Sequence, residues 1–207
     1  GHSRMMRDMT TWLRGKYSDV YIMAGNVATG QAVMDLVSWG ANAVKVGIGP
    51  GNVCTTKNVT GVTVPQFSAV KECANVVYGM NSKPLIVADG GITEIGDIAK
   101  ALGAGADLVM CGRLFASCRE APGERVGGKK VYRGMASRDA MSTIRNASSL
   151  PTAEGISTLI DASEQSASDV VNQIKGGLQS SFSYSNARNL EEFHLNVKFG
   201  IRHTQMK

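Results

Sequence analysis

Short apolar runs alternate with amphipathic stretches along the first half of the chain. Four of the apolar runs have the length of buried strands, and they lie at 21–24, 43–48, 84–88 and 108–111. Each run is continuous rather than alternating, which is typical of parallel strands covered on both faces. Helical spacing of apolar residues occurs before and between them, at 4–14, 29–39, 65–78 and 94–102. This alternation predicts an α/β fold, either a barrel or a doubly wound sheet.

The pattern dissolves between residues 120 and 163, where the chain is polar, rich in glycine and without clear periodicity. So long a segment without secondary structure in a compact domain is usually a functional flap or a disordered insertion. We therefore expect a single catalytic domain over residues 1–207 that carries a mobile flap at about 120–163. Helical spacing returns at 168–179, where Ser166 or Ser168 is the expected cap and the inward residues are Val170, Val171, Ile174 and Leu178.

Composition and charge exclude several classes of protein. No apolar run approaches the roughly 18 residues of a membrane span, and no signal peptide is recognisable, so we expect a soluble cytoplasmic protein. The net charge of +5 is mild for a protein that binds nucleic acid. Residues 113–133 nevertheless carry six arginines and lysines against two glutamates. That segment is either a solvated loop or a basic rim that steers a small anion.

The cysteines are not spaced as zinc ligands, because no CxxC pair occurs among the four. Cys73, Cys111 and Cys118 stand in apolar or helical surroundings and are interpreted as reduced core cysteines. Cys54 differs, because it ends a loop with three glycines and a proline in five positions, GIGPGNVC. Such a loop exposes backbone N–H groups around the thiol, and these conditions favour a thiolate.

Unusual residues lie where each expected strand ends, which is where α/β proteins place their sites. Asn26 and the 47–56 loop follow the first two strands, Asp89 with two glycines follows the third, and Gly112 follows the fourth. A carboxylate beside backbone amides suits a ribose hydroxyl next to a phosphate. The pattern therefore predicts a site for a phosphate monoester, although each glycine turn alone is a weak signal.

Two long motifs and three short ones resemble the inosine monophosphate dehydrogenase and guanosine monophosphate reductase family. They are AGNVATGQAVMDLVSWGANAVKVGIGPGNVCTTKNVTGVTVPQ, VADGGITEIGDIAKALGAGADLVMCGRLFA, APGE, VYRGMASRDAM and AEGI. The resemblance implies a (β/α)₈ TIM barrel that assembles into homotetramers. Only the C-terminal half of that barrel, four strand–helix units with the flap and a C-terminal helix, is visible in this chain. His2 and Ser3 match the family's GHS sequence after its fourth strand.

The resemblance also implies roles for individual residues. Cys54 matches the nucleophile that attacks C2 of the purine, Thr56 the threonine that assists proton transfer, and Glu154 the glutamate that pairs with the base. The matching substrate positions are Asn26, Asn52, Asp89, Gly90, Gly91, Gly112, Arg113, Tyr132, Gly134, Met135 and Gly155. Carbonyls of Gly49, Gly51 and Cys54 match a potassium site of the dehydrogenases.

The sequence departs from the family at three places. Asn52 replaces a serine that binds phosphate, and Arg113 replaces serine or glycine, although both side chains can still donate to phosphate. The acid that holds the cofactor ribose is expected before residue 1, so the chain has an incomplete dinucleotide site.

The spacing within the flap bears on the reaction. Twelve residues, STIRNASSLPTA, separate Met141 from Glu154, and they contain no Arg-Tyr pair of the kind that activates water in the dehydrogenase. We therefore favour the NADPH-dependent reductase, which converts GMP to IMP and ammonia. YRGMASRDAM and AEGI read more like the dehydrogenase, and the arginine that precedes the glutamate in the reductase is replaced by Pro151 and Thr152. An NAD-dependent IMP dehydrogenase that makes XMP remains the alternative, and an inactive nucleotide-binding half-barrel is the second.

Overall fold

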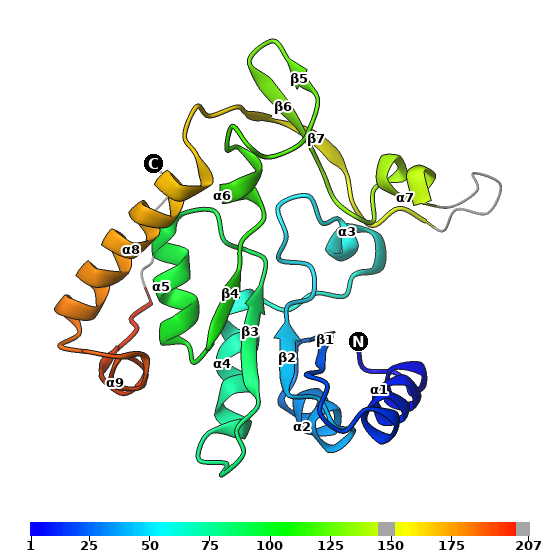
Figure 1. Cartoon of the computed structure of the whole chain (residues 1–207), viewed down its shortest axis with the longest axis vertical. Coiled ribbons are helices and arrows are strands. Elements are labelled where there is room, and N and C mark those ends of the chain that lie inside the picture. Colours follow the sequence, from blue (N-terminus) through cyan, green and yellow to red (C-terminus); the bar gives the residue numbers. More distant parts are fainter. Residues whose placement is uncertain (145–151, 202–207) are drawn as a thin grey trace.

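A computed structural model, which describes residues 1–144 and 152–201, has a parallel sheet at its centre (Figure 1). The strands β1 (Met23–Val27), β2 (Ala43–Val46), β3 (Leu85–Asp89) and β4 (Leu108–Met110) pair in sequence order, each parallel to its neighbour. The α/β fold with four parallel strands is confirmed. Among the described residues, no helix has both the length and the apolar character needed to cross a bilayer.

Helices cover one face of this sheet. They are α2 (Gly30–Ser38), α4 (Gln66–Val77) and α5 (Ile95–Gly103), with α8 (Ala167–Tyr184) and α9 (Leu190–Asn196) outside α5 (Figure 1). Val44 and Ile86 lie side by side in β2 and β3 and are fully buried against this layer. The first helix, α1 (Arg4–Lys16), lies at the other end of the sheet, beside α2. Apolar burial on this face accounts for the strands that the sequence predicted.

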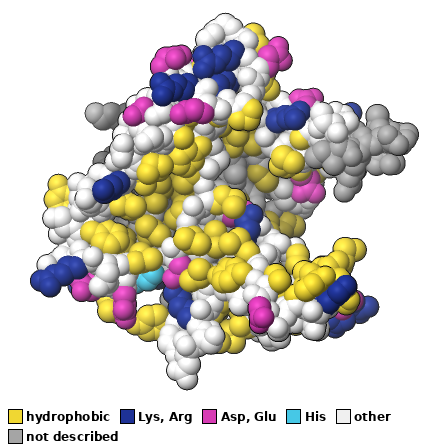
Figure 2. All heavy atoms as spheres, viewed as in Figure 1, with side chains coloured by type: hydrophobic (Ala, Val, Ile, Leu, Met, Phe, Trp, Pro, Cys, Tyr) yellow, Lys and Arg dark blue, Asp and Glu magenta, His cyan; other side chains and the backbone are white. Residues whose placement is uncertain are grey.

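The opposite face of the sheet is partly open. Met23, Leu108 and Met110 are 44%, 46% and 42% exposed, respectively. Strands β1 and β4 form the two edges, and within the described part of the chain neither has a second strand beside it. Figure 2 shows apolar side chains gathered over the sheet on the face in view. An apolar surface of this kind is characteristic of an interior that another segment covers.

The segment at 120–163 is not structureless, so this part of the prediction is wrong. It contains β5 (Arg125–Val126), β6 (Lys129–Arg133) and β7 (Ser157–Asp161), which form an antiparallel sheet in the order β5-β6-β7, here called the flap sheet. The helix α7 (Arg138–Ile144) follows β6. Charged side chains cover much of the flap sheet (Figure 2). Polar residues interrupt β6 and β7, which are partly exposed, so these strands lack the continuous apolar run that identified β1 to β4.

The structure decides between the two expected caps of α8. Ser166 is the cap, where it forms a reciprocal capping box with Asp169. Two other helix details differ from the expectation. Val170 is buried as expected, but Val171 is 51% exposed and does not face inward. The short helices α3 (Thr56–Thr60) and α6 (Arg113–Ala116) were not predicted, because one turn of helix leaves no periodic pattern.

Candidate active site

The loop after β2 presents Cys54 at the end of the sheet. Its glycines have backbone angles that favour glycine, with φ +149° at Gly47 and +83° at Gly49. A side chain on Gly47 would come within 2.3 Å of the Asp89 carbonyl oxygen, so the loop and β3 can approach only through a glycine. The Cys54 amide donates to the Gly51 carbonyl at 3.0 Å, which closes a turn around the thiol.

The flap sheet supplies the other wall of the site. Cys54 forms an isolated antiparallel bridge with Gly155, which stands just before β7. The Thr55 amide donates to the Glu154 carbonyl at 2.8 Å, and the Ile156 amide donates to the Val53 carbonyl at 3.0 Å. These bonds fix the Cys54 loop and the segment before β7 in register, although they lie about a hundred residues apart.

Three side chains form a hydrogen-bonded series across this junction. The Cys54 thiol lies 3.2 Å from Thr56 Oγ1, and that hydroxyl donates to Glu154 Oε2 at 2.8 Å. A thiol that donates to a hydroxyl, which itself donates to a carboxylate, is a route for a proton from sulfur to the carboxylate. The residues predicted as catalytic are therefore brought together.

A cavity of about 440 Å³ opens beside this series. Four of the expected substrate or cation residues line it with the series: Gly51, Gly134, Met135 and Gly155. Met135 is 74% exposed, so its side chain is available to a flat ring. Val53, Ala136, Met141 and Thr152 complete the lining. The volume falls within the range of pockets for small ligands.

Asp89 stands in a second cluster at the ends of β1, β2 and β3. Its Oδ2 accepts from Asn26 Nδ2 at 2.8 Å and pairs with Lys45 Nζ at 2.9 Å. The Asn26 amide also donates to the Gly47 carbonyl at 3.0 Å, so it joins the first strand to the cysteine loop. Sequence reasoning missed Lys45, although a lysine inside an otherwise apolar strand run is itself a signal of a buried partner.

Gln66 was also missed. Its Nε2 donates to the Val46 carbonyl at 2.8 Å and to the Asp89 carbonyl at 3.3 Å, so it ties the ends of β2 and β3 together. Its Oε1 is buried and has no hydrogen-bond partner among the described residues. The two carbonyls fix the orientation of the amide, because an amide oxygen turned toward them would be repelled.

The remaining expected binding residues lie around these clusters. Gly90 and Gly91 have φ +85° and +77° and lie against Pro50. Gly112 lies under the Tyr132 hydroxyl, which a side chain at that position would approach to 2.8 Å. Burial raises the pKa of Tyr132, while the charge of Arg113 acts in the opposite direction.

Two other expectations concern side chains on the surface. Asn52 and Arg113 are exposed, and neither forms a side-chain hydrogen bond within the described residues, so the structure does not join them to the clusters. Three of the six basic residues of 113–133 form exposed pairs with acids: Arg119–Glu120, Arg125–Glu164 and Lys129–Asp161, at 3.8, 3.4 and 3.9 Å. These pairs fit a solvated segment better than a basic rim, although β5 and β6 occupy part of it. Arg145 and Pro151, on which part of the flap argument depends, lie outside the described residues.

The other cysteines are chemically distinct from Cys54. Burial raises the pKa of Cys73 to about 12, with a further contribution from Glu72, and burial also raises the pKa of Cys111. Cys118 is buried and its thiol lies 3.6 Å from the Leu114 carbonyl. The core assignment is confirmed for Cys73 and Cys118, whereas Cys111 is only partly buried.

Comparison with known proteins identifies the family to which the chain belongs. The model of the IMP dehydrogenase / GMP reductase domain matches residues 1–206. The chain belongs to this family of purine nucleotide oxidoreductases. Inosine-5'-monophosphate dehydrogenase from Chlorobaculum tepidum is 46% identical over 214 residues, which cover 96% of this chain and 43% of the relative. GMP reductase 1 from Homo sapiens is 41% identical over 209 residues, which cover 99% of this chain and 60% of the relative.

A solved structure of the same IMP dehydrogenase / GMP reductase family is also similar. It is a cysteine-to-alanine variant of GMP reductase from Trypanosoma brucei in complex with guanosine 5'-monophosphate. The TM-score is 0.89 at 38% identity, and the match covers 99% of this chain and 43% of that one. The chain thus spans less than half the length of two of these proteins. The family uses an NAD(P)-type cofactor in general.

Proposed function

We propose that this chain carries the nucleotide site and the nucleophile of a GMP reductase. The observation that carries the proposal is the series of Cys54, Thr56 and Glu154 beside a cavity. A polarised thiol next to a relay to a carboxylate suits covalent attack on an electrophilic carbon. C2 of a guanine ring, bonded to three nitrogens, is such a carbon.

The residues divide the chemistry as follows. Cys54 loses its proton through Thr56 to Glu154, and its sulfur forms a bond to C2 of GMP. The bond from C2 to the 2-amino nitrogen breaks, and the nitrogen takes the proton back from the relay and departs as ammonia. When bound, NADPH would supply the hydride that replaces sulfur at C2, so that IMP forms and Cys54 leaves as a thiolate. That thiolate takes one proton from solvent before the next turnover. Each proton that Glu154 accepts is returned to the departing nitrogen.

The residues present fit the nucleotide better than the whole cofactor. Met135 and Met141 give the cavity an apolar side on which a nicotinamide ring can lie. The carboxylate that the family uses for the cofactor ribose has no match among the 207 residues, so we assign no residues to that part. In this proposal, only the nicotinamide end of NADPH would enter the cavity, where it would lie beside the purine.

We assign the nucleotide's sugar and phosphate to the neighbouring clusters. Asp89 would accept hydrogen bonds from ribose hydroxyls, with its carboxylate held by Lys45 and Asn26. The phosphate would lie among the glycine turns and Tyr132, with exposed Asn52 and Arg113 able to turn toward it. A potassium ion held by carbonyls of Gly49, Gly51 and Cys54 is compatible with the turn, because the Gly51 carbonyl keeps a second lone pair after accepting from Cys54.

The choice of reductase over dehydrogenase rests on chain length near the flap. Only twelve residues separate Met141 from Glu154, and no Arg-Tyr pair occurs among them. So short a segment without the water-activating pair supports the reductase in this proposal. The higher identity to the dehydrogenases, 46% against 41%, favours the alternative, an NAD-dependent IMP dehydrogenase.

We further propose a (β/α)₈ barrel as the setting of this site, in a cytoplasmic homotetramer. The likeness to a GMP reductase structure and the partly open apolar face of the sheet support a barrel of which these strands are half. An inactive nucleotide-binding half-barrel is the second alternative, and measured turnover of either substrate pair would exclude it.

The direction of the reaction is tested by giving the enzyme that contains this chain both substrate pairs. With GMP and NADPH we expect ammonia in equal amount to oxidised cofactor, and with IMP and NAD we expect no steady formation of XMP. A Cys54→Ala variant supplies the blank. Steady XMP formation faster than ammonia release would make the protein a dehydrogenase, and no turnover of either pair would favour the binding remnant.

A further inference from the structure

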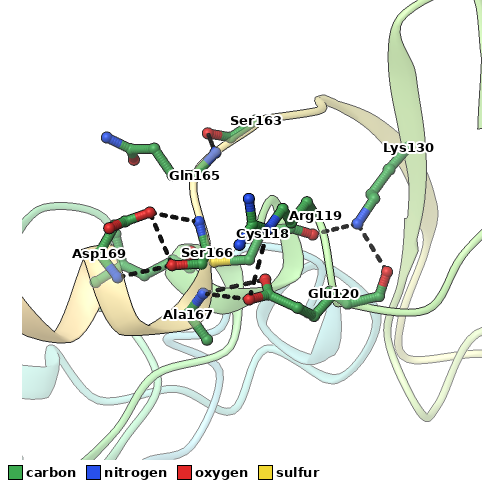
Figure 3. Close-up of polar contacts among 11 residues, drawn as sticks. Cys118, Arg119, Glu120, Lys130, Ser163, Gln165, Ser166, Ala167 and Asp169 are labelled. Carbon is green, nitrogen blue, oxygen red and sulfur yellow. Dashed lines mark hydrogen bonds and ion pairs between the residues drawn. The ribbon is translucent and has the colours of Figure 1, made fainter.

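One lysine of the flap sheet is buried without an acid. Lys130 on β6 is 2% exposed, although its neighbour Lys129 is exposed and reaches Asp161. The Lys130 ammonium donates to the carbonyls of Cys118 and Ala121, the latter at 2.7 Å (Figure 3). Within the described residues, it forms no ion pair with a carboxylate.

A buried charge with only neutral acceptors is costly, so its place in the fold needs an explanation. Both carbonyls belong to the turn that follows the short helix α6, whose last residue is Ala116. The Cys118 carbonyl also accepts from the Ala121 amide at 3.1 Å, so the ammonium binds the two ends of one turn. Lys130 therefore fastens β6 to the turn at the C-terminal end of α6.

That end of α6 is a junction of several segments. The Ser163 amide donates to the Ser117 carbonyl at 2.9 Å, and the Arg119 amide donates to the Gln165 carbonyl at 3.0 Å. The Glu120 carboxylate accepts from the Ala167 amide at 3.1 Å, at the start of α8. Figure 3 shows Lys130 reaching this junction from the flap sheet, on the opposite side from Ser166 and Asp169. We call residues 117–121 the junction segment.

The same strand also touches the other end of α6. Tyr132, two residues after Lys130, places its hydroxyl against Gly112, the residue that precedes α6. Strand β6 thus contacts the residues that flank α6 on both sides, and it pairs along its length with β7, which follows Glu154 and Gly155. Gly134, directly after β6, donates to the Ile156 carbonyl at 3.1 Å and lines the Cys54 cavity. A shift of β6 along α6 would move both the Gly112 end of the site and the Glu154 wall.

We propose that Lys130 is a positioning residue, which sets α6 and the glycine turn before it against the cavity wall that carries Glu154. The effect on substrate rests on the proposed function, because it takes Gly112, Arg113 and Tyr132 as the phosphate end of the nucleotide site. The mechanical part, that Lys130 couples the flap sheet to the junction segment, does not depend on the reaction.

The chain offers a matched control one residue away. Lys130→Met keeps the length of the side chain and removes the ammonium, and Lys129→Met makes the same change on the exposed face of the same strand. We expect amide hydrogen exchange of Arg119 and Ala121 to be at least about tenfold faster in Lys130→Met and unchanged in Lys129→Met. Equal exchange in the two variants would overturn the proposal.

Steady-state kinetics separate positioning from simple stabilisation. In Lys130→Met we expect KM for GMP to rise about tenfold, because a misplacement near 1 Å at a binding group has effects of that order or larger. We expect a smaller fall in kcat and a partial return in Lys130→Arg, which can donate to the same carbonyls. Faster exchange with unchanged KM and kcat would reduce Lys130 to a structural residue and contradict the proposal.

A measurement on the unaltered protein covers the case in which Lys130→Met does not fold. Saturating GMP should slow exchange at Arg119 and Ala121, although neither lines the cavity. No slowing there, while Gly134 and Gly155 become protected, would overturn the coupling. If GMP binds nowhere on the protein, the proposed function fails. The coupling of the flap sheet to the junction segment is then still tested, by comparing amide hydrogen exchange in Lys129→Met and Lys130→Arg.

Discussion

The parallel sheet and the flap sheet contribute to one site in opposite ways. Strands β2 and β3 are largely buried, and the loop after β2 holds Cys54 through Gly47 and Gly49, where a side chain would clash. The flap sheet has charged, half-exposed strands and contributes Glu154 from the segment that leads into β7. The nucleophile is therefore fixed by the core, and its carboxylate partner by a region with little core of its own. The hydrogen-bonded series of Cys54, Thr56 and Glu154 therefore depends on how the flap sheet packs against the Cys54 loop.

The largest effect should come from the core side of the site. Cys54→Ala should abolish turnover, because no other thiol is placed beside the Thr56 and Glu154 relay. The fold should be unaffected, since the Cys54 side chain is only partly buried, and circular dichroism with thermal unfolding checks this. Residual turnover above about a hundredth of the unaltered rate would show that the covalent step is not required.

The relay of Thr56 and Glu154 should have a smaller effect on the same step. Glu154→Gln and Thr56→Ala should each lower kcat by more than about tenfold, with less change in KM, if they move the proton. The control is Thr55→Ala, since the adjacent threonine has no side-chain capping bond. A fall in kcat for Thr55→Ala as large as for Thr56→Ala would remove the relay from the account.

The contrast between the two sheets also separates what the sequence predicts from what it does not. The four parallel strands have the continuous apolar runs of a buried sheet, so Ala43–Val46 and Leu85–Asp89 were found within two residues of their ends. The flap strands carry polar and charged residues and are exposed on one face, and β6 reads as Lys-Lys-Val-Tyr-Arg. Nothing local distinguishes such a strand from a loop, because its pairing with β5 and β7 makes it a strand.

The site shows the same division. Cys54, Thr56, Asp89 and the glycine turns follow predicted strands, and the family motif added Glu154 from far along the chain. Lys45 and Gln66 were missed, because their partners are carbonyls and a carboxylate on neighbouring strands, and strand pairing has to be known to see them. Lys130 was counted among the solvated or steering charges, and only its burial reveals a different role.

The thiols offer a third test, of moderate effect. Iodoacetamide at about pH 8 should modify Cys54 well before Cys73, whose raised pKa near 12 keeps it neutral, and GMP should protect Cys54. Earlier labelling of Cys73 or Cys118 would contradict the assignment.

The same pKa shift makes stability depend on pH. The pKa of Cys73 is 9.0 in the unfolded chain and about 12 in the folded chain. The free energy of unfolding should therefore fall as the pH rises between these two values. Urea unfolding at about pH 8 and about pH 10.5 measures the fall. It should be smaller in Cys73→Ala, and an equal fall in both proteins would mean that other groups cause it.

The smallest effect is expected in dynamics without ligand. Amides of β6 and β7 should exchange faster than those of β2 and β3, because the flap strands have fewer buried apolar contacts. GMP should reduce the difference in exchange rate between the flap strands and the core strands. Exchange in β6 as slow as in β2 before ligand is added would show that the flap sheet is as firmly docked as the core.

The central claim is that Cys54 bonds to the purine, and a quenched digest tests it most directly. The enzyme that contains this chain is mixed with GMP and NADPH, stopped with acid during turnover, digested and examined by mass spectrometry. The account predicts that the peptide with Cys54 carries the mass of GMP less ammonia, and that Cys54→Ala carries none. Turnover with no such adduct on Cys54, or with the adduct on another residue, would contradict it.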